Sequence, residues 1–129
     1  MASLYLSQNQ LDDASPTFKL TKLSSLYLDH NRVKSIAGVE KLRGLFSLSL
    51  SHNQISDLKP MADFAGAYNL FLESNKIRDL TPLVEMAKKD KDQRYAPFLN
   101  LYLKGNPLSS AAKGKQSAAL KEIGVRFNN

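Results

Sequence analysis

The chain has 129 residues, which is enough for one domain with a moderate hydrophobic core. It contains no cysteine, so disulfides, thiolate metal sites and cysteine nucleophiles are excluded, and no apolar run approaches the roughly 18 residues that cross a bilayer. Lys and Arg number 18 against 12 Asp and Glu, a formal net charge of +6 that would suit an acidic partner if it gathered on one face.

An eight-residue phrase occurs five times along the chain. "LYLSQNQL" at residues 4–11 returns as "LYLDHNRV" at 26–33, "LSLSHNQI" at 48–55, "LFLESNKI" at 70–77 and "LYLKGNPL" at 101–108. Its asparagines are Asn9, Asn31, Asn53, Asn75 and Asn106, so the period is 31 − 9 = 22 residues and only the last step, 106 − 75 = 31, is longer. A fixed period of this size predicts a stack of repeats, with nine extra residues inserted before the last one.

Each phrase predicts a short strand followed by a turn. The two leucines of "LYL" flank one outward residue, which is the period of a strand with one buried face. Strands at a fixed period stack in parallel about 4.8 Å apart, so we expect one curved sheet of about five strands. The asparagine amide has both donors and an acceptor, and we expect it to satisfy backbone groups where each strand turns away, forming a ladder.

The segments after each phrase predict short helices or turns on the other side of the sheet. Pro16, Pro60 and Pro82 fall at the same repeat position, and proline is favoured at the first position of a helix. In "LTPLVEMAKK" the hydroxyl of Thr81 is the expected N-cap.

The repeated pattern resembles the leucine-rich repeat family, in its 22-residue class. "ISDLKPMADF" and "IRDLTPLVEM" share the Ile, Asp, Leu, Pro and final hydrophobe of that class, which occurs in bacterial internalin-like proteins and in phosphatase-regulating repeat proteins. Ser35 and Gly38 depart from the pattern, as do Ala14 and Thr17. The resemblance implies an α/β leucine-rich repeat solenoid that recognises proteins, and a secreted or cell-surface location for an intact bacterial parent.

We expect a single domain over residues 1–129, with repeats at about 1–22, 23–44, 45–66, 67–97 (including an insertion at 89–97) and 98–108. Residues 109–129 predict a C-terminal cap: Ser109 or Ser110 starts a helix that covers the last repeat, Gly124 ends it, and "VRF" adds a short strand. Met1 already occupies the apolar position of a first repeat, so we expect no N-terminal cap and a chain that is a fragment of a longer protein.

Function in such a fold depends on the outward residues of the sheet. The column between the paired leucines is mostly aromatic, and the next column is polar. The predicted partner-binding residues are therefore Tyr5, Tyr27, Ser49, Phe71 and Tyr102 from the first column and Asp29, Ser51, Glu73 and Lys104 from the second. Ser49, with Ser47 and Ser51, predicts a notch between Tyr27 and Phe71. The alternative is that the rings only stack on one another and stabilise the sheet.

Other chemistries find less support. His30 and His52 lie one repeat apart, but a zinc site needs three or four ligands and only Asp29 is nearby. No phosphate loop, nucleophile elbow or close carboxylate pair is present, so we expect no enzyme and no cofactor. Residues 76–129 hold eleven basic and five acidic groups, mostly off the sheet, which argues against nucleic acid on the aromatic face.

The insertion has two interpretations that the sequence leaves open. It is either a featureless loop, or a loop whose Tyr95, Pro97 and Phe98 pack on the repeat and position Lys91 and Arg94 beside the Tyr102 end of the sheet.

The sequence favours a protein-protein interaction module that binds on its concave sheet face, without membrane insertion. Two alternatives stay open: a structural element that self-associates as a homodimer through its uncapped edge or aromatic face, and a glycan-binding module that uses the same rings.

Overall fold

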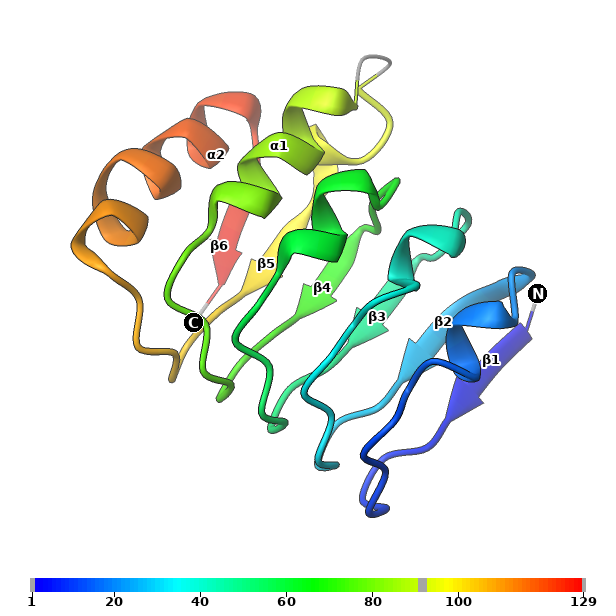
Figure 1. Cartoon of the computed structure of the whole chain (residues 1–129). Coiled ribbons are helices and arrows are strands. Elements are labelled where there is room, and N and C mark those ends of the chain that lie inside the picture. The colour runs from blue at the N-terminus through cyan, green and yellow to red at the C-terminus, as the bar shows by residue number, and fades with distance from the viewer. Residues whose placement is uncertain (1, 91–92, 129) are drawn as a thin grey trace.

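A computed structural model describes residues 2–90 and 93–128 and contains one parallel sheet of six strands in chain order (Figure 1). The strands are β1 (Ala2–Tyr5), β2 (Leu23–Tyr27), β3 (Ser47–Ser49), β4 (Asn69–Phe71), β5 (Asn100–Tyr102) and β6 (Arg126–Asn128). The expected α/β solenoid is thus confirmed, and the sixth strand covers Arg126–Asn128, shifted by one residue from the predicted "VRF". Each of the first five strands begins before a repeated phrase and ends at its second residue, and β6 belongs to the C-terminal cap.

Short helical segments cover the opposite side of the sheet (Figure 1). Single 3-10 turns form η1 (Thr17–Lys19), η2 (Val39–Lys41), η3 (Lys59–Asp63) and η4 (Ala96–Phe98), while the fourth repeat forms the α-helix α1 (Thr81–Lys89). Pro60 and Pro82 stand at the start of η3 and α1, as the sequence predicts. We call the open side of the sheet, which faces away from these helices, the concave face.

Before several of the helical segments, a side-chain oxygen accepts a hydrogen bond from the backbone N–H two residues further along the chain. Asp79 Oδ1 accepts from the N–H of Thr81 at 3.1 Å and from its hydroxyl at 2.7 Å, so the prediction that Thr81 caps α1 is wrong. Asp57 accepts from the N–H of Lys59 in the same way. Where the sequence replaces this aspartate with Ser35, its hydroxyl accepts from the N–H of Ala37 at 3.2 Å. The departure at Ser35 therefore preserves the hydrogen bond.

The predicted asparagine ladder runs through the interior and joins each repeat to the one before it. Asn53 Nδ2 donates to the carbonyl of Leu50 in its own repeat and to that of Leu28 in the preceding repeat, both at 3.0 Å. Its Oδ1 accepts from the N–H of Val33 at 3.0 Å. Asn31, Asn75 and Asn106 repeat this pattern. Backbone groups left open by the short strands are thus satisfied by side chains.

The core lies between the sheet and the helical segments. The inward leucines of the strands, such as Leu26, Leu48 and Leu101, are fully buried. The longest helix, α1, turns Leu83, Val84 and Met86 toward the same core. Each repeat buries its leucines against the neighbouring repeats. The core of one repeat is therefore complete only when the repeats beside it are folded.

A helical cap closes the C-terminal side. It consists of η5 (Ala112–Gln116), a π-helical stretch, and α2 (Ser117–Ile123), and the hydroxyl of Ser109 accepts from the N–H of Ala112 at 3.1 Å. Gly124 follows in the left-handed conformation at φ 115°, as expected for a C-terminal glycine. Gln116 connects the cap to the fourth repeat: it accepts from the N–H of Leu80 at 2.7 Å and donates to Asp79 at 2.9 Å.

Replacing Asn53 by Ala is expected to lower the free energy of unfolding by at least about 2 kcal/mol, because buried backbone groups in two repeats lose their partners. Asn9→Ala is the matched control, since Asn9 is exposed and its amide donates only to carbonyls of its own repeat. That variant should lose about 1 kcal/mol or less, because water replaces the side chain. Urea unfolding followed by circular dichroism measures both, and equal losses would contradict the ladder's role.

Acid is expected to weaken the junction between α1 and the cap. Hydrogen bonds from the hydroxyl and N–H of Thr81, and from Gln116, hold the pKa of Asp79 below its ordinary value of 3.8. As the pH falls, the unfolded chain binds this proton first, so the stabilisation is present above pH 3.8 and is lost as the pH falls through the lower folded pKa.

The stability difference between the wild type and Asp79→Asn should therefore shrink as the pH is lowered from about 6 to about 2.5. Thermal unfolding at both pH values measures it. Asp12→Asn, which removes an exposed carboxylate elsewhere in the chain, controls for the change in net charge. A difference that stays constant with pH would exclude Asp79 as the titrating group.

Candidate functional site

The concave face brings the predicted aromatic column into one row across five strands. The strand register pairs Tyr5 with Tyr27, Tyr27 with Ser49, Ser49 with Phe71 and Phe71 with Tyr102. The rings form two stacked pairs, one on each side of Ser49. Tyr5 and Tyr27 have centroids 4.7 Å apart and planes 4° apart, and Phe71 and Tyr102 have centroids 4.4 Å apart and planes 19° apart. The predicted partner-binding rings are therefore stacked on one another across neighbouring strands.

The rings differ in how much surface they offer. Tyr5 is 69% exposed, whereas Tyr27, Phe71 and Tyr102 are half-buried. Ser49 is only 4% exposed. The neighbouring side chains therefore leave almost no opening at the predicted serine notch.

Beside the rings, the polar column forms hydrogen-bonded pairs between neighbouring repeats, just beyond the ends of the strands. The Ser7 hydroxyl donates to Asp29 at 3.0 Å, and the Ser51 hydroxyl donates to Glu73 at 3.3 Å. Lys104 at the end of the column is exposed. Because the serines hold the two carboxylates, the acidic groups have fixed positions next to the aromatic row.

The sixth strand extends the concave face beyond the residues that the sequence singled out. Arg126 and Asn128 pair with Asn100 and Tyr102, so the alternation of the strand puts them on the same face. Asn128 donates to Asn100 at 3.4 Å, and Asn100 donates to Asn69 at 3.2 Å. The exposed side chain of Arg126 thus lies at the same end as Lys104. Polarity changes along the face, from acidic groups in the middle to basic groups at the C-terminal end.

The two histidines lie where the strands turn out of the sheet. Their rings stack with centroids 4.2 Å apart and planes 9° apart. His30 has φ 59° and His52 has φ 58°, and every residue at this repeat position is in the left-handed region: Gln8, His30, His52, Ser74 and Gly105. Over residues 2–90 and 93–128, no three His, Cys, Asp or Glu side chains gather as metal ligands would. The imidazoles stack on each other's faces rather than converging on a common point.

The insertion carries a second aromatic cluster, at the edge where the strands begin. Tyr68 packs against Phe46 and Tyr95, with centroids 5.4 Å apart in both cases, and against Phe98 at 6.5 Å. Phe46 is 56% exposed and Phe98 is 53% exposed. Sequence reasoning placed Tyr95 and Phe98 at the base of the insertion but missed Phe46 and Tyr68, which precede their strands by one residue.

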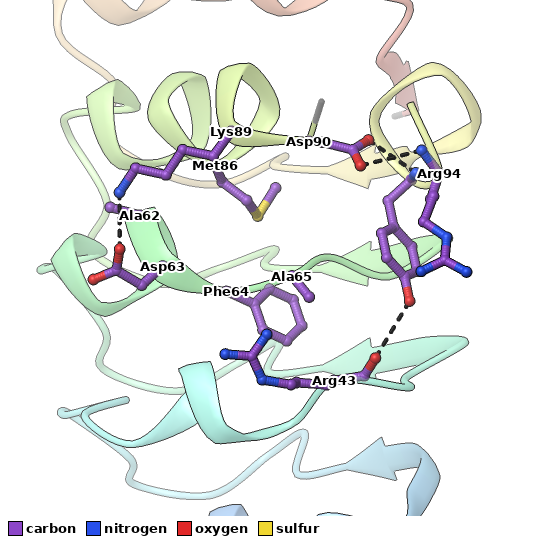
Figure 2. A pocket seen from close by; sticks show the side chains of 10 residues that line it. Arg43, Ala62, Asp63, Phe64, Ala65, Met86, Lys89, Asp90 and Arg94 are labelled. Atoms are coloured by element: carbon purple, nitrogen blue, oxygen red, sulfur yellow. Dashed lines mark hydrogen bonds and ion pairs between the residues drawn. The ribbon is translucent and has the colours of Figure 1, made fainter. Parts of the chain in front are cut away.

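A groove of about 530 Å³ opens beside this cluster, between η3, α1 and the loop that follows α1 (Figure 2). Arg94 lines it together with Arg43. The sequence interpretation that put Arg94 beside the Tyr102 end of the sheet is thus wrong, because Arg94 lies at the groove. Lys91 lies outside the described residues.

None of the helices in the described ranges is long and apolar enough to cross a membrane.

Comparison with known proteins finds the same architecture in two internalins and a further leucine-rich repeat protein. The leucine-rich repeat family model matches residues 1–55. Internalin C2 from Listeria monocytogenes is 29% identical, with a TM-score of 0.75 over 98% of this chain and 51% of that chain. A second internalin from the same species is 28% identical, with a TM-score of 0.60 over 100% of this chain and 41% of that one.

A leucine-rich repeat protein from Leptospira interrogans has a TM-score of 0.70 at 23% identity, over 98% of this chain and 36% of that one, which shows the shared fold. No curated protein sequence matches the chain significantly. The chain spans about half or less of each of these solved chains.

Gly66→Ala is expected to destabilise the protein by roughly 1–3 kcal/mol. Gly66 has φ +125°, and an added Cβ would lie 2.8 Å from the Tyr95 Cβ, so Tyr95 would have to move. Gly44→Ala is the control, because a Cβ there meets nothing within 4 Å. Urea unfolding and the near-UV circular dichroism of the tyrosines report on both. A loss of stability that is equal in the two variants would contradict the close packing of Tyr95 on Gly66.

Proposed function

We propose, from the premise that this chain is a leucine-rich repeat protein with an internalin-like fold, that it binds a partner protein on its concave face. Solenoids of this kind present an extended curved surface formed by equivalent positions of successive repeats. The observation that carries the proposal is the row of four aromatic rings across the sheet. Aromatic side chains on a rigid surface are the commonest anchors of protein interfaces.

The stacked pairs favour recognition because the rings are already ordered. Tyr27 is held against Tyr5, and Phe71 against Tyr102, so binding costs little side-chain entropy. In the adjacent column, Asp29 and Glu73 would set the partner's orientation through charge, with Lys104 at the far end. Ser49 and Ser51 contribute little accessible surface, at 4% and 5% exposed, so we assign Ser49 the spacing between the ring pairs and Ser51 the positioning of Glu73.

Self-association is the second candidate, and one observation favours it. Tyr5 of the outer strand β1 is 69% exposed, and Leu20, which lines a pocket with Ala2 of that strand, is 48% exposed. Among the strands described, β1 pairs only with β2. Exposed apolar groups next to a strand edge promote pairing with another chain.

Glycan binding finds less support in the ring geometry. Stacking on a sugar uses the face of an aromatic ring. Tyr27 and Phe71 each use one face on a neighbouring ring. The exposed parts of the row therefore suit edge contacts and hydroxyl hydrogen bonds with a protein partner better than a sugar platform.

The test compares two double variants. Tyr27→Ala/Phe71→Ala removes one ring from each stacked pair, and Lys34→Ala/Lys59→Ala changes exposed residues outside the sheet. Immobilised protein is incubated with a lysate and the culture medium of the source organism, and the captured proteins are quantified by mass spectrometry. We expect a partner that the wild type and the lysine variant retain equally and that the aromatic variant retains about tenfold less.

Light scattering during size-exclusion chromatography, over an about hundredfold range of concentration, separates self-association from partner binding. A wild type that stays monomeric leaves the concave face free for a foreign partner. Dimers that the aromatic variant abolishes would assign that face to self-contact instead. Equal capture by both double variants would contradict binding on the concave face.

A further inference from the structure

The groove between η3, α1 and the following loop has more basic side chains than its own acidic side chains pair with in the described ranges. Three basic side chains and two acidic ones line it, together with apolar side chains, among them Ala65, Met86 and Tyr95. It lies among the helical segments and at the edge where the strands begin, so it is separate from the concave face (Figures 1 and 2).

Both carboxylates of the groove are already engaged. Asp63 accepts a hydrogen bond from Lys89 Nζ at 2.8 Å, which also neutralises the charge of the lysine. Asp90 accepts from three successive backbone N–H groups of the loop, those of Arg94, Tyr95 and Ala96, at 3.1, 2.9 and 2.8 Å. Asp90 therefore holds residues 94–96 in place, and each carboxylate already has a partner within the groove other than an arginine side chain.

The guanidinium groups of the two arginines have no partner in the part of the chain that the structure describes. Within residues 2–90 and 93–128, no carboxylate pairs with Arg43 or Arg94, and neither guanidinium donates a hydrogen bond. Both side chains are exposed, and Figure 2 shows them on different sides of the groove. Each guanidinium offers five N–H donors in a planar arrangement that matches a carboxylate.

The segments that carry the arginines are fixed to each other. The Tyr95 hydroxyl donates to the carbonyl of Arg43 at 3.3 Å, which joins the loop after α1 to the turn after η2. The Tyr95 ring lies directly over Gly66, where no side chain intervenes. The insertion thus places Arg94 in a defined position relative to Arg43, and the site is preorganised.

We infer that this groove binds an acidic peptide segment of a protein partner, with Arg43 and Arg94 each receiving a carboxylate. The apolar wall and the adjacent exposed rings of Phe46 and Phe98 suit an apolar residue next to the acidic ones. The charge of the molecule agrees, because the net +6 comes from residues 76–129, with eleven basic and five acidic groups. The proposal does not depend on the function of the concave face.

The experiment uses a fluorescein-labelled peptide of alternating glutamate and leucine, with a glutamine-leucine peptide of the same length as its control. Fluorescence anisotropy measures binding to the wild type and to Arg43→Gln/Arg94→Gln. A charge-matched control, Lys34→Gln/Lys113→Gln, removes two exposed lysines that lie outside η3, α1 and the loop that border the groove. Urea unfolding confirms that the variants fold. We expect the arginine variant to bind the glutamate peptide about tenfold more weakly, and the lysine variant within about twofold of the wild type.

Two further measurements sharpen the result. Tyr27→Ala/Phe71→Ala should leave peptide affinity unchanged, which separates this groove from the concave face. Gly66→Ala should weaken binding although both arginines remain, because it displaces Tyr95. Equal weakening by the arginine and lysine variants would overturn the proposal in favour of diffuse charge attraction. Absence of peptide binding, or displacement of the peptide by inorganic phosphate at about equal concentration, would overturn it too.

Discussion

The asparagine amide at the end of each strand is the interaction on which the rest of the structure depends. Strands of three to five residues leave many backbone groups without a partner once the chain leaves the sheet. Asn31, Asn53 and Asn75 satisfy these groups and do so across two repeats at once. The distance between repeats is thereby set, and the leucine packing and the alignment of the surface columns follow from it.

Because the columns are aligned, the side chains that stack and stabilise the sheet are the same ones to which we assign recognition. Equivalent residues of successive repeats lie about 4.8 Å apart, which is close to the spacing of stacked rings. Aromatic residues at the same position of neighbouring repeats therefore stack, as Tyr5 does with Tyr27 and Phe71 does with Tyr102. Ser49 interrupts the row and divides it into two rigid pairs. Under the proposed function, the binding surface has a shape that the sheet already determines.

The parts of the fold that follow from the 22-residue period could be predicted from the sequence. The parts that depend on how particular side chains pack or bond in three dimensions could not. The strands, the asparagine ladder and Gly124 each come from a local pattern. At the start of α1 the accepting side chain is Asp79 and not the predicted Thr81, because the carboxylate reaches both the N–H and the hydroxyl of the threonine. The left-handed conformation of His30 and His52 was missed, since glycine occupies that position only once.

The candidate site divides in the same way. The aromatic row was predictable because register follows from the period, although the burial of Ser49 depends on how its neighbours pack. The arginine groove was not predictable, because Arg43 and Tyr95 are brought together from 52 residues apart by an insertion with no counterpart in the other repeats.

That contact also changes how the chain is expected to unfold. In a simple array each repeat touches only its neighbours, so the ends fray and unfolding proceeds stepwise. Tyr95 follows the fourth repeat's helix, covers Gly66 at the end of the third repeat and bonds to Arg43 in the second. Three repeats are thereby joined into one cooperative block, and the first repeat remains outside it as the part that opens independently.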